Sequence, residues 1–118
     1  QDPARTSAEM IMQVEDISNA LLTEGTPKDW NSTNVAIIGL TDGTHRIDQD
    51  KLDELMNMDY SETKRSFKTY YNFYIYFESE EKFDIIGNPP LNEHNIISVT
   101  RIVVHKNKIV KMVVQLWV

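Results

Sequence analysis

The sequence predicts an α+β fold in which an N-terminal amphipathic helix packs on one face of an antiparallel β-sheet of about four strands, with short connecting helices. Apolar residues recur at helical spacing near the N-terminus, whereas apolar and polar residues alternate with a period of two near the C-terminus. A chain of 118 residues fits one domain. We therefore expect a single domain over 1–118, with the helix at about 6–24, a connecting segment at 26–70 and the sheet at about 71–118.

The N-terminal helix carries a narrow apolar stripe. At about 100° per residue, four side chains fall on one side of the helix and are expected to form the helix–sheet interface: Met10, Val14, Ile17 and Leu21. Met12 lies instead in the polar arc of the helix. It is a candidate contact with a neighbouring subunit, or simply an isolated exposed methionine.

Both ends of this helix carry residues typical of helix boundaries. Thr6 and Glu9 fit a capping box, in which the hydroxyl and the carboxylate each accept a backbone N–H of the other residue. Gly25 fits the left-handed residue that closes a last turn, and Pro27 cannot continue a helix.

The connecting segment predicts one strand and two short helices. The apolar run 35–40 suits a buried strand, and a turn follows it. Asp48 is a good N-cap for a helix that ends near Met58 and carries three apolar side chains on one face, namely Leu52, Leu55 and Met56. Ser61 can cap a further helical turn or two that extends to Phe67.

The last third of the chain predicts the sheet. Aromatic and β-branched residues at 71–78 indicate a strand, with Phe73, Ile75 and Phe77 on one face, and 83–86 is its expected partner. Segments 96–105 and 109–118 form the clearest hairpin, joined at 106–108. Its final strand offers an apolar face to the N-terminal helix, formed by Val110, Met112, Val114, Leu116 and Val118.

Charge and motifs exclude several classes of function. A net charge of −6 disfavours binding to nucleic acid or to an anionic membrane surface. The sequence contains no cysteine, and its three histidines are too far apart for a zinc site, so we expect solvated histidines at 45, 94 and 105. An acidic group lacks the glycine and distal glutamate of an EF-hand loop and fits the first turn of a helix better, namely Asp48, Asp50, Asp53 and Glu54. We expect no catalytic residue, no cofactor and no metal.

One modification motif is present. The tripeptide Asn31-Ser32-Thr33 fits the N-glycosylation sequon and lies in a polar loop, where a glycan could be accommodated. Asn31 is therefore the candidate glycosylation site. The motif has a meaning only if the protein is exported.

Several short motifs, spread over nearly the whole chain, together carry a family resemblance. They are Ile17–Leu22, Gly25-Thr26-Pro27-Lys28-Asp29-Trp30, Ile38-Gly39-Leu40, Lys51-Leu52 with Leu55, Tyr60, Tyr74-Ile75-Tyr76-Phe77 and the closing 101–117 hairpin with its Gln115-Leu116-Trp117 ending. In this order the chain resembles the soluble head domains of archaeal surface proteins of the type IV pilin-like class.

The resemblance implies a non-enzymatic, extracellular or cell-surface head domain with a role in filament assembly, adhesion or surface interaction. In that family a cleaved signal precedes a hydrophobic helix, which anchors the protein in the membrane or packs into a filament core. The resemblance therefore implies that the helix here continues a longer one, and that only a segment absent from this chain contacts the membrane. The implied partners are other surface or pilus subunits, contacted through the N-terminal helix.

The alternative is a cytosolic small-ligand-binding module. In this hypothesis the helix and a curved sheet enclose an apolar pocket lined by four residues, namely Phe73, Ile75, Phe77 and Trp117. The same side chains also fit plain core packing. A deep pocket with convergent polar groups would favour the module, and a packed interior would remove it.

Overall fold

The computed structural model describes residues 3–92 and 95–118. Its elements, in chain order, are α1 (Pro3–Leu21), α2 (Gln49–Asn57), α3 (Tyr60–Ser66), β1 (Asn72–Glu78), β2 (Lys82–Gly87), β3 (Ile96–His105) and β4 (Lys108–Trp117). A long N-terminal helix, two short helices and a four-stranded antiparallel sheet confirm the predicted α+β fold.

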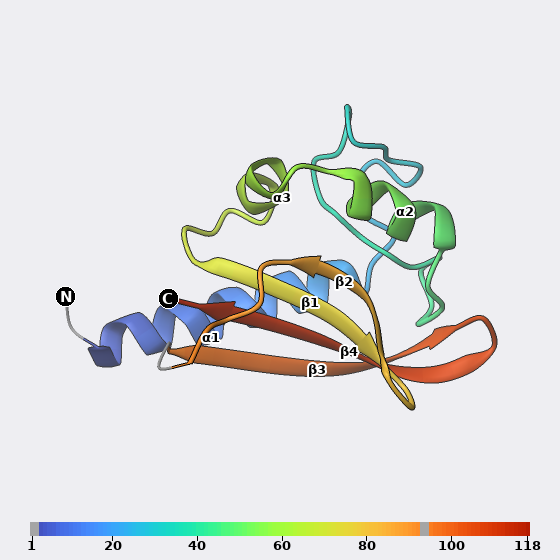
Figure 1. The fold of residues 1–118 in the computed structure, drawn as a ribbon. Helices are drawn as coiled ribbons and strands as arrows, with labels where there is room; N and C mark the ends of the chain where they lie inside the picture. The colour runs from blue at the N-terminus through green and yellow to red at the C-terminus, as the bar shows by residue number, and fades with distance from the viewer. Residues whose placement is uncertain (1–2, 93–94) are drawn as a thin grey trace.

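The sheet has the strand order β2-β1-β4-β3, and every neighbouring pair is antiparallel. Helix α1 runs along one face of this sheet and contacts β3 and β4 (Figure 1). Helices α2 and α3 pack over the same face beside β1 and β2, where the Tyr60 ring of α3 stacks on Phe73 and α2 contacts β2. The strand order makes β2 and β3 the two edges of the sheet.

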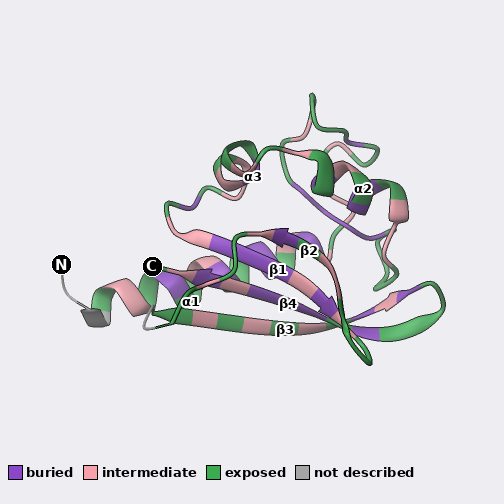
Figure 2. Ribbon diagram, in the orientation of Figure 1, coloured by how far each residue is buried: buried purple, intermediate pink, exposed green. Residues whose placement is uncertain are grey.

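The hydrophobic core forms between one face of the sheet and the elements that cover it, namely α1, α2 and the segment between them. One apolar cluster contains Phe73, Ile75 and Phe77 of β1 together with the stripe of α1 and the inward-facing residues of β4. Figure 2 shows buried residues along β1 and β4, the two central strands. Burying each large apolar side chain contributes about 1.5–3 kcal/mol, so this cluster is the main driving force for folding.

The β3–β4 hairpin has a tighter turn than the sequence predicts. His105 pairs with Lys108, so only Lys106 and Asn107 form the loop. Both have positive φ, at 50° and 65°, as a type I′ turn requires. This turn matches the twist of the two strands and fixes their register over ten residue pairs.

The predicted boundaries of α1 were wrong at both ends. The helix begins at Pro3, so Thr6 and Glu9 lie within it and form no capping box. The Glu9 carboxylate instead accepts a hydrogen bond from the Tyr71 hydroxyl at 2.9 Å. At the other end, Gly25 has the expected positive φ of 82° but lies beyond the last helical residue, Leu21.

The predicted strand at 35–40 is not part of the sheet. Its ladder contact is a single bridge from Ile37 to Thr26, and Ile37 is 47% exposed. The segment pairs with the end of α1, where the Leu40 N–H donates to the Leu21 carbonyl at 2.9 Å. It therefore supplies an N–H donor to the helix terminus, whose last carbonyls lack intrahelical donors, instead of extending a strand ladder.

The short helices agree with the sequence in type but not in every residue. Asp48 caps α2 by accepting hydrogen bonds from the N–H groups of Asp50 and Lys51, as predicted. Met56 is 43% exposed and does not share the buried face of Leu52 and Leu55. Ser61 lies inside α3 and does not cap it, because that helix already begins at Tyr60.

Candidate functional site

The four residues expected at the helix–sheet interface are buried. Met10, Val14 and Leu21 have no exposed surface, Ile17 is 3% exposed, and all belong to the core cluster. Met12 is 61% exposed. The structure therefore gives this helix a closed inner side and an outer side on which an apolar residue is accessible.

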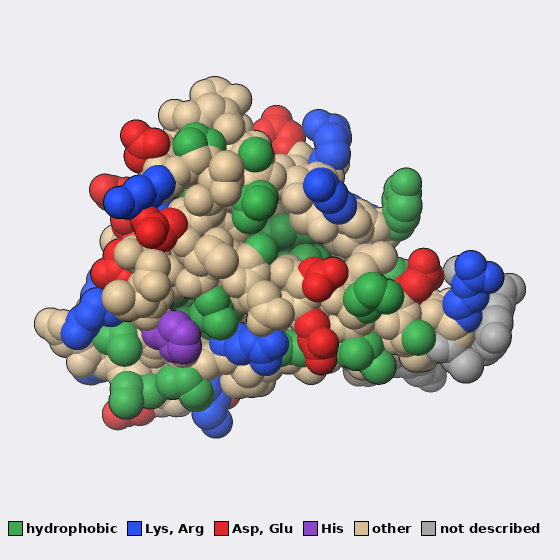
Figure 3. Space-filling view, turned by 180° about the vertical axis from the view of Figure 1, so that it is seen from behind, with side chains coloured by type: hydrophobic (Ala, Val, Ile, Leu, Met, Phe, Trp, Pro, Cys, Tyr) green, Lys and Arg blue, Asp and Glu red, His purple; other side chains and the backbone are tan. Residues whose placement is uncertain are grey.

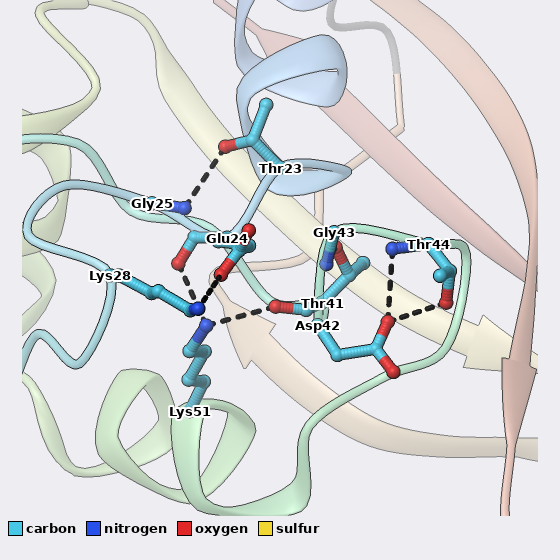
Figure 4. A network of polar contacts seen from close by, with 9 residues as sticks. All are labelled: Thr23, Glu24, Gly25, Lys28, Thr41, Asp42, Gly43, Thr44 and Lys51. Carbon is cyan, nitrogen blue, oxygen red and sulfur yellow. Dashed lines mark hydrogen bonds and ion pairs between the residues drawn. The ribbon is translucent and has the colours of Figure 1, made fainter.

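A buried lysine joins three segments at the C-terminal end of α1. The Lys51 side chain, 8% exposed, comes from α2. Its Nζ donates hydrogen bonds to the carbonyl oxygens of Glu24 and Thr41, each at 2.9 Å (Figure 4). The Thr41 hydroxyl in turn donates to the Leu22 carbonyl at 2.7 Å. Carbonyls at and just after a helix end have no intrahelical partner, and a cation placed there also interacts favourably with the helix dipole.

Close backbone packing completes this arrangement. A Cβ atom on Gly39 would lie 2.2 Å from the Gly25 nitrogen, so the two chain segments can approach this closely only with glycine at position 39. The Trp30 indole donates to the Gly39 carbonyl at 2.8 Å and is 3% exposed. We call Gly25, Trp30, Gly39, Thr41 and Lys51 the Lys51 cluster.

The Lys51 cluster unites motifs that are separate in the sequence. Its members come from Gly25–Trp30, from the Ile38-Gly39-Leu40 run with the adjoining Thr41, and from Lys51-Leu52. These are among the motifs that carry the pilin-like resemblance. Lys51 holds these segments together, a role that no pattern in the sequence predicted.

An acidic groove borders the Lys51 cluster. Two adjoining hollows of about 490 and 680 Å³ are lined by acidic side chains together with Trp30, Lys28 and Lys51, the acidic ones being Glu24, Asp29, Asp42, Asp48, Asp50, Asp53 and Glu54. Several of these carboxylates already have partners within the protein. Asp48 caps α2, Asp53 accepts from the Gln49 amide at 2.8 Å, and Glu54 accepts from the Ser32 N–H at 3.1 Å.

The electrostatics of the groove follow from these internal contacts. Hydrogen bonds from the Thr44 hydroxyl and N–H lower the pKa of Asp42, because they favour the ionised carboxylate. Within the described residues, no group of three or more potential ligands is arranged to hold a metal ion. Asp42, Asp48 and Glu54 act here as acceptors for loop and helix N–H groups.

One of the three histidines departs from the prediction. His45 is exposed as expected, and His94 lies outside the described residues. His105 is only 8% exposed, stacks on the Phe83 ring at 5.4 Å and lies 2.8 Å from Gln49 Oε1 through its Nε2. Burial and, secondarily, the nearby charge of Lys106 lower the pKa of His105, while Asp84 opposes them. The neutral ring is therefore a structural element, not a solvated side chain.

The sequon occupies an exposed, ordered turn. Asn31 is exposed, and its Oδ1 accepts hydrogen bonds from the Thr33 N–H at 2.9 Å and the Thr33 hydroxyl at 2.6 Å. The Asn31 N–H donates to Asn34 Oδ1 at 2.7 Å. Among the described residues Nδ2, the atom to which a glycan is attached, has no hydrogen-bond partner.

The residues expected to line a ligand pocket do not meet. Phe73, Ile75 and Phe77 are at most 1% exposed and face α1, whereas Trp117 pairs with Asn72 and lies on the opposite face of the sheet. An apolar hollow of about 180 Å³ lies between α1, residues 36–38 and the end of α3. The predicted pocket lining was therefore wrong, because strand alternation separates Trp117 from the other three.

None of the helices in the described part of the chain is both long enough and apolar enough to cross a membrane. Comparisons with protein-family models, with curated proteins and with solved structures gave no match. The functional interpretation therefore depends on the geometry of this chain and on the motifs in its sequence.

Proposed function

We propose that this chain is the non-enzymatic extracellular head domain of a pilin-like or membrane-anchored archaeal surface protein, with a role in filament assembly, adhesion or surface interaction. The observation that carries the proposal is the Lys51 cluster. Motifs that lie far apart in the sequence meet in this cluster. Their hydrogen bonds hold the segments that follow α1 against the end of that helix. A head domain built on a longer helix requires such a rigid junction.

The orientation of α1 also supports the proposal. Its N-terminal turns extend beyond the end of the sheet, while its C-terminal end is held by the Lys51 cluster (Figure 1). A helix fixed at one end and protruding at the other is suited to join a longer helical spine. In the proposal, other surface or pilus subunits contact the protein through this helix, and an upstream hydrophobic segment contacts the membrane.

The exposed sequon fits the same location. An exposed asparagine in a surface turn is accessible to a glycosyltransferase, and such modification belongs to exported proteins. The proposal therefore includes a glycan on Asn31.

The native gene provides the decisive test. We expect it to encode an apolar segment of about 20 residues directly upstream of Ala4, enough to span a bilayer as a helix. An ordinary cytosolic start at that point would refute the proposal. Imaging of native cells with an antibody against this domain then distinguishes the two forms, since a pilin labels filaments and an anchored protein labels the cell envelope.

A further inference from the structure

Strand β3 has an open edge. The Val104 N–H donates to the His45 carbonyl and the Val104 carbonyl accepts from the Ile47 N–H, both at 2.8 Å, so these groups point away from β4. Successive residues of a strand alternate in direction, and the backbone groups of Ile96, Ser98, Thr100 and Ile102 therefore point the same way. All four residues are exposed, and within the described chain these outward groups have no hydrogen-bond partner.

The opposite edge of the sheet is protected against pairing, whereas β3 is not. Strand β2 has six residues, positive φ at Asp84 and Gly87, and an irregular register with β1. Short length, distortion and charge are the usual means by which proteins block an edge strand. Strand β3 has ten residues, regular register with β4 and no positive φ. Hydrophobic side chains also reach the surface along the lower rim of Figure 3, the side on which β3 lies.

An apolar residue of α1 flanks the same edge. Glu9 and Gln13 accept hydrogen bonds from Tyr71 and Thr69, which lie just before β1. Because β4 separates β1 from β3 in the sheet, the flank of α1 that carries Glu9 and Gln13 faces away from β3. Ile11 is two positions from each of them, about 200° around the helix, and therefore lies on the flank toward β3. It is 46% exposed.

We propose that the open edge of β3 pairs antiparallel with the same edge of a second copy of this chain, which joins the two four-stranded sheets into one. The distribution of charge makes the β3 edge the surface on which two copies can meet. The net charge of −6 makes two copies repel each other over most of their surfaces. The outward residues of β3 are uncharged, and the strand's one charged residue before His105 is the cation Arg101.

The edge is also complementary to itself. Glu15 lies one turn beyond Ile11 on α1 and is exposed, while Arg101 reaches the same helix and donates to Asn19 Oδ1 at 3.2 Å. A two-fold axis brings the Arg101 of each copy toward the Glu15 of the other. An isologous contact of this kind closes as a dimer.

One register pairs the outward backbone groups of β3 in both copies with suitable residue neighbours. With Val99 on the two-fold axis, Ile96 lies opposite Ile102 of the second copy and Ser98 lies opposite Thr100. These pairs match apolar with apolar and hydroxyl with hydroxyl. A register centred on Thr100 would place Ile96 opposite Val104, whose outward groups are already bonded to residues 45 and 47. This contact does not depend on the proposed surface location.

Sedimentation of the 118-residue chain from about 1 µM to about 1 mM tests the pairing. We expect a monomer–dimer equilibrium. Thr100→Pro removes an outward N–H and no internal hydrogen bond, and by symmetry it removes two bonds per dimer, so the dissociation constant should rise roughly 10- to 30-fold. Thr100→Lys should also weaken the dimer and serves as the second variant if the proline disturbs folding.

The matched control places the same charge on the other edge. Ile85→Lys, at an exposed position of β2, should leave the dissociation constant unchanged. A chain that remains monomeric throughout, or a dimer that Thr100→Lys leaves intact and Ile85→Lys disrupts, would overturn the proposal.

Disulfide trapping tests the register. The sequence has no cysteine, so Val99→Cys introduces a single thiol. Directly opposed residues of a non-hydrogen-bonded antiparallel pair have Cα atoms about 4.5 Å apart, within the range of a disulfide. Val99→Cys should cross-link on mild oxidation faster than Thr100→Cys. Faster cross-linking of Thr100→Cys, or none by either variant, would contradict this register.

Discussion

The Lys51 ammonium group lies 2.9 Å from the carbonyl oxygen of Glu24, 27 positions earlier in the sequence, and so joins α2 to the segment that leaves α1. A second bond of equal length to the Thr41 carbonyl makes Lys51 the common donor for both sides of the junction. One buried cation thereby holds the end of α1 in place.

Lys51→Met should destabilise the protein by about 2–3 kcal/mol, because two carbonyls lose a charged donor while the aliphatic stem is retained. Chemical denaturation followed by circular dichroism measures this change. Lys28→Met is the matched control. The Lys28 side chain is 84% exposed and lies 3.7 Å from Glu24 Oε2, so its removal should change stability by less than about 0.5 kcal/mol. Equal effects of the two substitutions would contradict the role of Lys51.

Gly39→Ala should prevent folding or cost roughly 3 kcal/mol or more, because the new Cβ would meet backbone atoms of Thr23 and Gly25 at 2.4 and 2.2 Å. Gly43→Ala provides the comparison. Its Cβ would meet the flexible Glu24 carboxylate at 2.9 Å, and its φ of 94° adds backbone strain, so a cost of about 1–2 kcal/mol is expected. Thermal unfolding of both variants checks the order. A Gly39→Ala protein as stable as the Gly43→Ala protein would show that the two segments can separate.

Much of the fold was predictable because burial leaves a period in the sequence. Phe73, Ile75 and Phe77 recur at every second position, and the structure confirms their common buried face. The cap of α2 was also predictable, since Asp48 acts on N–H groups two and three positions away. Local geometry and periodic burial are the two properties that a single sequence records directly.

The parts of the fold and of the candidate site that the sequence did not predict depend on contacts between distant segments. The composition of the apolar run 35–40 does not indicate whether a strand is available to pair with it. In the structure its Leu40 N–H bonds to the end of α1 instead. Lys51 bonds to backbone carbonyls, which carry no side-chain signature. His105 is buried by Phe83 and Gln49, and neither position can be paired with it from spacing alone.

Met10→Ala should destabilise the protein by about 2–4 kcal/mol, because Met10 is fully buried in the core and its truncation leaves a cavity. Met12→Ala removes the same side chain from the outer side of the same helix, at a position 61% exposed, and should cost less than about 0.5 kcal/mol. Urea unfolding of both variants measures the difference. A large loss of stability in Met12→Ala would mean that the outer side of α1 is covered in the folded monomer.

His105 should make stability depend on pH near neutrality. Burial lowers the pKa of His105 in the folded protein below its usual value of about 6.5, so the unfolded chain binds the proton first. The free energy of unfolding should therefore be fully retained above about pH 7 and decrease as the pH falls through about 6.5. The slope is limited to about 1.4 kcal/mol per pH unit, the value for one whole proton, and is smaller at any pH where the folded protein also binds part of that proton.

Denaturation of His105→Gln between about pH 7 and pH 5.5, above the usual range of carboxylates, separates this histidine from other groups. The substitution should flatten the dependence on pH. His45→Gln, at an exposed position, should leave the slope unchanged. The interpretation fails if His105→Gln keeps the full slope.

Glycosylation of Asn31 should depend on Thr33 and not on Ser32. The Thr33 hydroxyl donates to Asn31 Oδ1 at 2.6 Å and supplies the third position of the sequon, so Thr33→Ala should abolish the modification. Ser32→Ala changes the adjacent exposed residue but keeps the sequon intact, and occupancy should persist. Intact mass measurement of the protein from native cells detects the glycan directly. An unmodified mass for the unaltered protein would remove Asn31 as a glycosylation site, and a glycan retained in Thr33→Ala would place the modification elsewhere on the chain.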